Sequence, residues 1–354
     1  MPARLRRNVW KRIFACWFLV LSGLVLPTAG AQRPHEPAHT EAYLFAHMMK
    51  GDYGTLYYSV SLDGLHWTFL NGGKTVFPEY HGHASIAKGA DQRYYLVGNR
   101  GDNAKAINFW VSDDLIHWKK FGDYTPDLTK IPNYPHPLQR IGAPKLSYDA
   151  PSGQFLLMWH TPTVPGNPSN PEAYWSSQRT LYVTSKDLVH FSSPQRLFTW
   201  DMATIDTIIR PDGEGGYCAI VKDERYPNYN ITTGKTIRIS CAQNLLGPYP
   251  EPGAPVSPNF REAPTLVPSP DGRDWYLYYE QYAGTSYGLS MAPRIQGPWY
   301  QVSGNSGVPE WNRYEMTPGA RHGSMITISR KEYDALLAAF GASPSGDQAA
   351  PAAH

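Results

Sequence analysis

The sequence of 354 residues has few cysteines, few charged residues and no long hydrophobic run. It contains three cysteines and no HExxH motif, paired CxxC motif or glycine-rich phosphate loop, so metalloprotease, zinc-ribbon and nucleotide-binding functions lack support. Charged residues make up only 18% of the chain. The apolar run from Ile13 to Leu26 is too short to cross a membrane comfortably.

That apolar run belongs to a predicted signal peptide over residues 1–31. Five basic residues precede or open it, and Ala29 to Ala31 offers small residues for cleavage before Gln32. Sec export to the periplasm or the exterior is therefore expected, with no stable membrane anchor after cleavage. Removal leaves 27 of the 32 basic residues against 30 acidic ones, so the charge gives no reason to expect a nucleic-acid partner.

What the chain does have is a repeated phrase in which a Ser-x-Asp turn leads to an aromatic residue. The closing aromatics of successive copies are 51, 73, 58 and 50 residues apart, which is the spacing of four-stranded propeller blades. Alternating aromatic and β-branched runs before each phrase predict strands. The three clear copies and two weaker echoes are Ser61 to Trp67, Ser112 to Trp118, Ser185 to Phe191, Ser240 to Tyr249 and Ser290 to Trp299.

These repeats predict an all-β, five-bladed β-propeller over residues 41–340. The last innermost strand leads into a capping box and a short helix rather than into further strands, so strands at 42–48 and 55–61 must complete that blade and close the ring. A β-sandwich is the alternative, but it needs no such repeat. The five segments expected to form the innermost strands are 83–87, 143–148, 206–210, 263–267 and 322–329.

Residues outside this domain are expected to be disordered: a linker at 32–40 and a tail at 341–354, both rich in proline, alanine and glycine. Cys218 and Cys241 fall on neighbouring strands of one blade. An inter-strand disulfide is plausible in an oxidising compartment, and two buried thiols are the alternative. The oligomeric state is left open.

Candidate functional residues lie where the innermost strands begin, around the central channel. These starts carry His83, Lys145, Asp206, Glu262 and His322. A carboxylate is costly to bury there unless it is paired or functional, and two come from separate blades. Two convergent carboxyl groups in a sugar-sized pocket suit glycoside hydrolysis. The structural alternatives are a turn-capping Asp206 and buried histidines with satisfied hydrogen bonds.

The phrases around these residues resemble those of glycoside hydrolase family 43, the five-bladed arabinosidase, xylosidase and galactanase group. Ile205 to Ile209 followed by Asp212-Gly213 matches the phrase of the aspartate that tunes the acid, which implies that role for Asp206. Arg261 to Thr265 matches the phrase of the general acid, which implies proton donation by Glu262. The His-Gly phrase of the last blade implies that His322 lines the pocket floor, and Lys222 matches a further family phrase.

The chain departs from the family at the first inner strand. The family has an aspartate there as general base, whereas this sequence reads Tyr80-His-Gly-His83. His83 could act as the base, Asp102 or Glu224 could replace it, or hydrolysis could have been lost and sugar binding kept. Exo-galactanases of the family also lack the usual base, which favours galactose.

The sequence therefore predicts an exported glycosidase that cleaves arabinose, xylose or galactose from polysaccharide fragments by inversion. The alternatives are a non-catalytic carbohydrate-binding propeller and a protein-interaction propeller. No metal or cofactor is expected, apart from a structural calcium ion that the channel could hold. The predicted catalytic residues are Glu262, Asp206 and His83, and the predicted substrate-binding residues are His322, Lys222, Lys145, Trp159 and Arg261.

Overall fold

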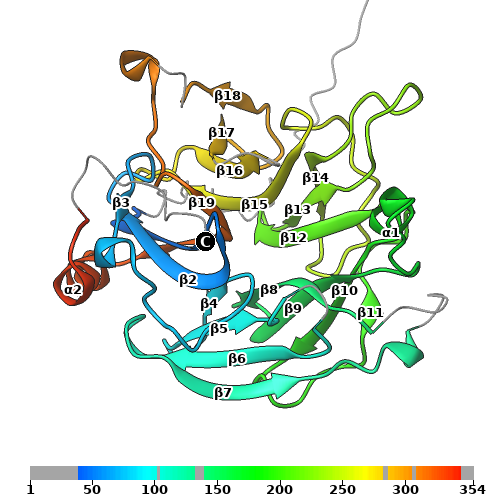
Figure 1. Cartoon of the computed structure of the whole chain (residues 1–354), viewed down its shortest axis with the longest axis horizontal. Coiled ribbons are helices and arrows are strands. Elements are labelled where there is room, and N and C mark those ends of the chain that lie inside the picture. The colour runs from blue at the N-terminus through cyan, green and yellow to red at the C-terminus, as the bar shows by residue number, and fades with distance from the viewer. Residues whose placement is uncertain (1–38, 102–103, 132–138, 282–285, 305–307, 344–354) are drawn as a thin grey trace, which may run out of the picture. The chain divides into compact units, whose positions relative to one another are not determined.

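The computed structural model describes residues 39–101, 104–131, 139–281, 286–304 and 308–343, and the predicted signal peptide lies outside them. Five antiparallel sheets surround one central axis, each with its first strand innermost (Figure 1). The first blade consists of β4 (Ser85–Lys88), β5 (Tyr94–Gly98), β6 (Ile107–Ser112) and β7 (Lys119–Tyr124). The second consists of β8 (Gly142–Asp149), β9 (Gln154–Thr161), β10 (Arg179–Ser185) and β11 (Gln195–Arg196).

The remaining three blades complete the ring. The third consists of β12 (Thr204–Pro211), β13 (Tyr217–Asp223) and β14 (Thr236–Ala242). The fourth consists of β15 (Arg261–Pro268), β16 (Trp275–Gln281), β17 (Tyr287–Ala292) and β18 (Tyr300–Val302). The fifth joins C-terminal β19 (Ala320–Ile328) to N-terminal β1 (Ala42–Met49), β2 (Asp52–Ser61) and β3 (Thr68–Phe69). The predicted five-bladed propeller, closed by both ends of the domain, is confirmed.

The repeated phrase forms the same turn in the three clear copies. In the first, Ser61 Oγ accepts a hydrogen bond from the Gly64 amide at 2.9 Å, and Asp63 Oδ1 accepts from the amides of Leu65 and His66 at 2.8 Å. His66 lies on the surface against the same aspartate, and its counterparts His117 and His190 do likewise. These side chains replace ladder partners at the strand end, so the recurring histidines are structural.

Hydroxyl and carboxylate oxygens link neighbouring innermost strands around the axis. Ser85 Oγ on β4 accepts from the Leu146 amide on β8, and Ser324 Oγ on β19 accepts from the Ile86 amide on β4. Thr265 Oγ1 on β15 accepts from the amide of Met325 on β19 at 2.8 Å. The blades are thereby tied together at the channel wall, which holds the strand starts in fixed relative positions.

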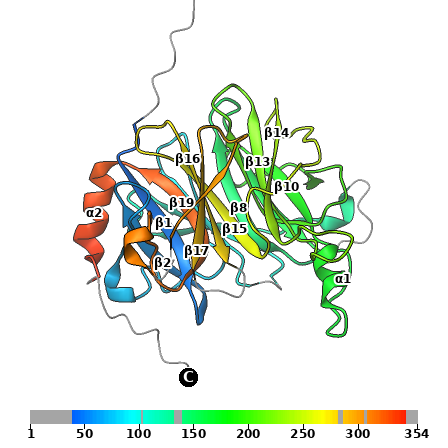
Figure 2. The same cartoon turned by 90° about the horizontal axis from the view of Figure 1, so that it is seen from above.

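The described residues also form two α-helices and three short 3-10 helices outside the sheets. Helix α2 (Arg330–Phe340) has the predicted capping box between Ser329 and Glu332 and buries Leu336 against the fifth and first blades. Helix α1 (Pro171–Ser176) lies on the opposite side of the propeller (Figures 1 and 2). The 3-10 helices are Asn71–Gly73, Leu128–Lys130 and Pro309–Trp311. Within the described part of the chain, no helix is both long and apolar enough to cross a membrane.

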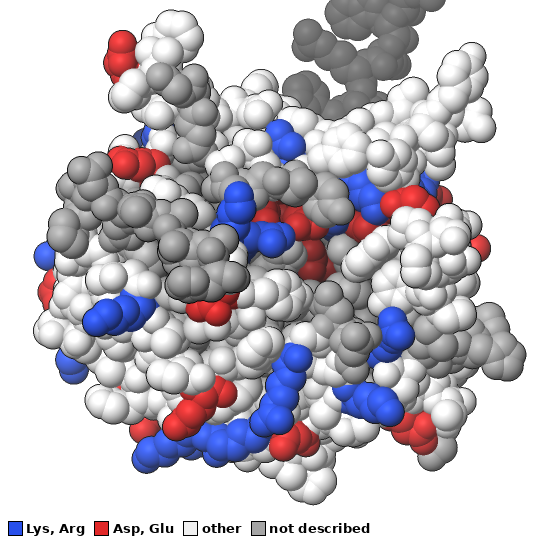
Figure 3. All heavy atoms as spheres, in the orientation of Figure 1, with Lys and Arg blue, Asp and Glu red and all other residues white. Residues whose placement is uncertain are grey.

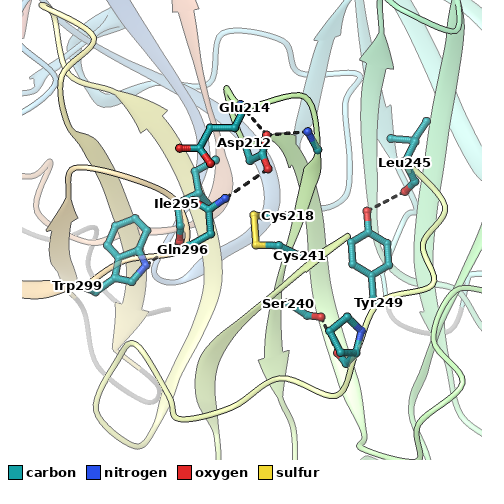
Figure 4. Close-up of a disulfide and its surroundings, with 12 residues drawn as sticks. Asp212, Glu214, Cys218, Ser240, Cys241, Leu245, Tyr249, Ile295, Gln296 and Trp299 are labelled. Carbon is teal, nitrogen blue, oxygen red and sulfur yellow. Dashed lines mark hydrogen bonds between the residues drawn. A yellow bond between two sulfur atoms is a disulfide. The ribbon is translucent and has the colours of Figure 1, made fainter. Parts of the chain in front are cut away.

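The Cys218–Cys241 disulfide joins directly opposed residues of β13 and β14 (Figure 4). It packs beside Ile295 and Trp299 of the fourth blade, within the apolar cluster between the third and fourth blades. The two cysteines are separated by 23 residues. The structure thus supports the disulfide over the two free thiols.

Backbone hydrogen bonds hold the last residue of the linker expected at 32–40 and the first residues of the tail expected at 341–354. Gly341 donates its amide to Leu337 O and ends α2, Ala342 forms a bridge with Leu70, and the Ser343 amide donates to Phe69 O at 2.8 Å. At the other end, the Thr40 amide donates to a carbonyl of the fourth blade, Pro270 O. The expected tail at 341–354 is therefore wrong for its first three residues, because backbone pairing with β3 holds them.

Candidate active site

Four innermost strands have a residue in the left-handed backbone region at their second or third position. Ala143, Asp206, Ala263 and His322 have φ values of 36°, 51°, 48° and 20°, and β8, β12 and β15 shift register there against their partner strands. Gly82, just before β4, has a φ of 136°. Such bulges turn a strand end and re-aim its side chains. They collect residues of separate blades at one end of the channel.

Asp206, Glu262 and His322 meet at this end and are all buried. His322 Nε2 lies 3.9 Å from Asp206 Oδ2 and 3.8 Å from Glu262 Oε1. Burial acts to raise the pKa of Asp206, but the positive charges of His322 and Lys145 outweigh it and hold that pKa well below its usual range. Asp206 Oδ2 also accepts a hydrogen bond from the Ala263 amide at 3.1 Å, which fixes the carboxylate next to the residue after Glu262.

A third carboxylate, Glu280 on β16, completes this cluster. It accepts from Arg321 Nε at 2.6 Å and from the His322 amide at 3.0 Å, and its Oε2 lies 2.7 Å from His322 Nδ1. Burial acts to lower the pKa of His322, yet Glu280, Glu262 and Asp206 together raise it to about 9. His322 is therefore an imidazolium at neutral pH, held between three carboxylates.

Lys222 connects Glu262 to a fourth carboxylate, Glu224. Its ammonium lies 2.9 Å from Glu262 Oε2 and 2.8 Å from Glu224 Oε2, and Glu224 also pairs with Lys235. Burial acts to lower the pKa of Lys222, but Glu224 and Glu262 raise it well above its usual value. Lys222 is thus a fixed positive charge that orients one oxygen of Glu262 and leaves the other facing His322.

His83 lies beside His322, with ring centroids 4.9 Å apart. Its Nε2 is 2.9 Å from the hydroxyl of Tyr53, which comes from β2. Burial and the neighbouring His322 charge lower the pKa of His83 well below its usual range, against the opposing effect of Asp206. His83 is accordingly neutral, beside the cationic His322.

The other predicted residues lie at different depths. Lys145 is buried on β8, two positions beyond the bulge residue Ala143 and therefore deeper in the channel. Arg261 is partly exposed and donates to Asn259 O and Phe260 O. Trp159 is only 2% exposed and packs in the apolar cluster of the first and second blades, with Nε1 donating to Thr161 Oγ1. A sugar ring has no access to Trp159 in this position, so stacking by Trp159 is corrected to packing between blades.

The charged cluster lies in a hollow of the propeller face. Figure 3 shows acidic side chains in its depth and basic side chains on both sides. Ligand atoms of Glu262, Glu280 and His322 lie within 4.8 Å of one another and could hold a metal ion. Ion pairs with Lys222 and Arg321 already neutralise these carboxylates, so the donor set fits a cation poorly.

Sequence reasoning did not identify Glu280, His160 or Tyr53, although a signal for the first two is present. In an antiparallel blade the second strand ends where the first begins, and Glu280 is paired with Glu262 as His160 is with Gly142. Polar residues at the ends of second strands therefore also face the site. Asp102, named as a substitute base, lies outside the described residues.

Several solved structures of glycoside hydrolases are similar to this chain at low sequence identity. The structure of an exo-β-1,3-galactanase from Phanerochaete chrysosporium with β-1,3-galactotriose is 17% identical in sequence; the match covers 62% of this chain and 49% of the galactanase chain, with a TM-score of 0.44. A xylan β-1,4-xylosidase from Bacillus halodurans is 20% identical, over 70% of this chain and 46% of the xylosidase, with a TM-score of 0.47. An arabinanase from Bacillus subtilis is 14% identical, over 68% of this chain and 79% of the arabinanase, with a TM-score of 0.47. This chain spans about half the length of the first two structures.

A comparison with curated proteins gave no match. The family model, in contrast, covers most of the chain. Residues 38–334 match the model of a group related to glycoside hydrolase family 43 and described as "Probable glycosyl hydrolase domain". This range includes all five blades and the complete charged cluster. The chain belongs to this family of glycosidases.

Proposed function

We propose that the chain is an exported glycosidase that removes terminal or side-chain arabinose, xylose or galactose from polysaccharide fragments with inversion. The convergence of Glu262 and Asp206 on His322, at 3.8 and 3.9 Å, is the observation that carries this proposal. Fold alone would not support it, because propellers host many functions. The hollow presents carboxylates of two blades to one ligand, as hydrolysis of a glycosidic bond requires.

Glu262 is assigned the role of general acid, donating a proton to the leaving glycosidic oxygen. Lys222 fixes one of its oxygens, and His322 lies beside the other. Asp206 stays ionised because its pKa is held low, and it can offset positive charge that develops on the sugar in the transition state. Arg321 and Glu280 keep His322 in place from the opposite side.

The water-activating group is assigned to the His83 side of the site. Neutral His83 can accept a proton, but the lowered pKa makes it a weak base, and a second imidazolium beside His322 would be repelled. Tyr53 holds its Nε2, so Nδ1 is the nitrogen that can meet a water molecule. We therefore assign His83 to hold the attacking water and to accept its proton as the bond forms.

Hydrolysis of a panel tests the proposal. Nitrophenyl arabinofuranoside, xyloside and galactopyranoside and β-1,3-galactan would be incubated with the wild-type protein, Glu262→Gln and the exposed control Glu214→Gln. Turnover by the wild type and the control, reduced by about 10²- to 10⁴-fold in Glu262→Gln, is expected. Equal turnover by all three proteins would refute the role of Glu262. Proton NMR of the first-formed sugar should show the inverted anomer, and retention would contradict the mechanism.

One observation favours a carbohydrate-binding propeller as the second candidate. Just before the first inner strand, where the resemblance implies an ionised base, lies His83, whose pKa is lowered well below its usual range by burial and which meets the Tyr53 hydroxyl at 2.9 Å. Under this alternative no substrate is cleaved, while sugars still raise the melting temperature of the wild type. Glu262→Gln would then change affinity only slightly, whereas His83→Ala would weaken the binding contact itself.

Export is the remaining part of the proposal. The basic segment, apolar run and Ala29-Gly-Ala31 site support it, as does the Cys218–Cys241 disulfide, which persists in oxidising compartments. N-terminal sequencing of the protein recovered outside the cytoplasm should begin at Gln32. A mature protein that retains Met1 to Ala31 in the cytoplasm would contradict export.

A further inference from the structure

A small pocket lies in the central channel, deeper than the charged cluster of the candidate active site. It is formed by residues that follow the bulges of the innermost strands, including Lys145 on β8, Arg210 on β12 and Ser324 on β19. Its polar lining consists of Ser85, Lys145, Ser147, Arg210, Thr265 and Ser324. Both long side chains in this lining are basic, and no carboxylate belongs to it.

The two cations of the pocket have few partners. Lys145 is 2% exposed, and its ammonium has no hydrogen-bond partner among the residues that the structure describes. The guanidinium of Arg210 donates to the neighbouring Ile209 O at 3.0 Å. Burial lowers the pKa of both groups, and Asp206 only partly offsets this for Lys145. An ammonium that is buried without a hydrogen bond is costly and calls for a compensating acceptor.

The hydroxyls of the pocket add further donors. Ser85, Thr265 and Ser324 each accept a hydrogen bond from a backbone amide of a neighbouring strand. Because a hydroxyl has one proton to donate in addition to its lone pairs, each O–H can turn toward the pocket. The lining therefore offers an ammonium, a guanidinium and hydroxyl protons, and a ligand that only accepts hydrogen bonds matches it.

We propose that this channel pocket binds a monatomic anion of the size of chloride. The space suits about one water-sized sphere, which admits chloride or bromide and excludes tetrahedral sulfate. A water molecule satisfies the donors less well, since it brings two protons of its own. The anion neutralises Lys145 and Arg210 and ties β8 to β12. Among the described residues, a side-chain oxygen accepts a hydrogen bond from a backbone amide between each of the other four pairs of neighbouring inner strands, three times on a hydroxyl and once on Asp206, but none joins β8 to β12. This proposal does not rest on the proposed catalytic function, although the charge of Lys145 also lowers the pKa of Asp206.

Thermal unfolding of the full chain in halide tests the anion site. Sodium chloride or bromide would be titrated at constant ionic strength, with sodium methanesulfonate as the balancing salt. A saturable rise of the melting temperature by about 3 °C is expected, because a ligand that binds only the folded state stabilises it by mass action. Sodium sulfate should give no saturable rise at equal ionic strength, because it raises the melting temperature only gradually through exclusion from the protein surface. Arg210→Met should abolish the halide effect, while the surface control Arg273→Met keeps it.

Bromide soaks of wild-type crystals give a readout that does not depend on a variant folding. An anomalous peak between Lys145 and Arg210 is expected. A melting temperature that is insensitive to halide, or crystals without a peak in the pocket, would overturn the proposal. An equal halide effect in wild type and Arg210→Met would also overturn it, because the anion would then act elsewhere.

Discussion

Replacing His322 by glutamine should remove a pH-dependent part of the free energy of unfolding. His322 lies 2.7 Å from Glu280 and within 4 Å of Glu262 and Asp206, and these carboxylates raise its pKa from 6.5 to about 9 despite burial. A tenfold change in proton affinity corresponds to about 1.4 kcal/mol, so the imidazolium contributes roughly 3 kcal/mol of stability. Glutamine keeps a similar size and can donate a hydrogen bond, but it cannot carry the charge.

The direction of the pH dependence follows from the raised pKa. The folded protein binds the proton more tightly than the unfolded chain, so the stabilisation is complete below about pH 6.5 and is lost as the pH rises through about 9. The difference in unfolding free energy between wild type and His322→Gln should therefore shrink by roughly 3 kcal/mol between pH 6.5 and pH 10. Any pH-independent cost of the substitution cancels in this comparison.

Urea unfolding at several pH values between 6.5 and 10 measures this quantity, with the slope against urea checked at each pH. His190→Gln is the matched control, because His190 is an exposed histidine paired with one surface aspartate. Its difference from the wild type should stay small and nearly constant. A difference for His322→Gln that does not change over this range would refute the assignment of His322 as an imidazolium held by the three carboxylates.

Three further variants test other parts of the fold. Gly142→Ala should lower activity and stability sharply, because the added methyl would lie 1.9 Å from the His160 ring. Gly122→Ala is the control, because a methyl there meets nothing within 4 Å. Kinetics and melting temperatures of both variants test this difference. Removing the disulfide by Cys218→Ser with Cys241→Ser should lower the free energy of unfolding by about 3 kcal/mol, because the bond closes a loop of 23 residues. Urea unfolding under oxidising conditions measures this, and an unchanged free energy of unfolding would show that the bond does not form. Ser329→Ala should cost about 1 kcal/mol by removing the cap of α2, and an unchanged unfolding midpoint would contradict the capping box.

The fold could be predicted from the sequence because its local signals recur. Each Ser-x-Asp turn is fixed by short-range hydrogen bonds within the phrase, so residues near one another in sequence determine it. The same holds for the capping box at Ser329 and for the opposed cysteines on adjacent strands. The closure of the ring could be predicted because the sequence shows no strands after the last inner strand, so the N-terminal strands had to complete its blade.

Membership of the charged cluster could be predicted only for residues that match a family phrase. The phrases single out Asp206 and Glu262, which the structure places beside His322. Glu280 matches no phrase, and its position in the cluster depends on the antiparallel pairing of β15 with β16. Tyr53 contributes from β2 on the closing blade, and no local pattern announces its contact with His83. Trp159 was misjudged because the sequence gives its strand but not which neighbouring blade covers it.

The bulges explain why the two-residue alternation of a strand predicts which side chains face the deeper channel but not which ones meet at the strand starts. Below the bulges, alternation directs side chains such as Lys145 and Ser324 to the channel, as the two-residue period of a strand requires. At the bulges, Ala143, Asp206 and Ala263 adopt a left-handed backbone that the period does not encode. A left-handed backbone conformation costs free energy for most residues other than glycine, and the hydrogen bonds between inner strands must offset this cost. The bulges thus bring Asp206 and His322 together in the charged cluster. The regular strands beneath them supply the rigid frame that keeps the cluster in place.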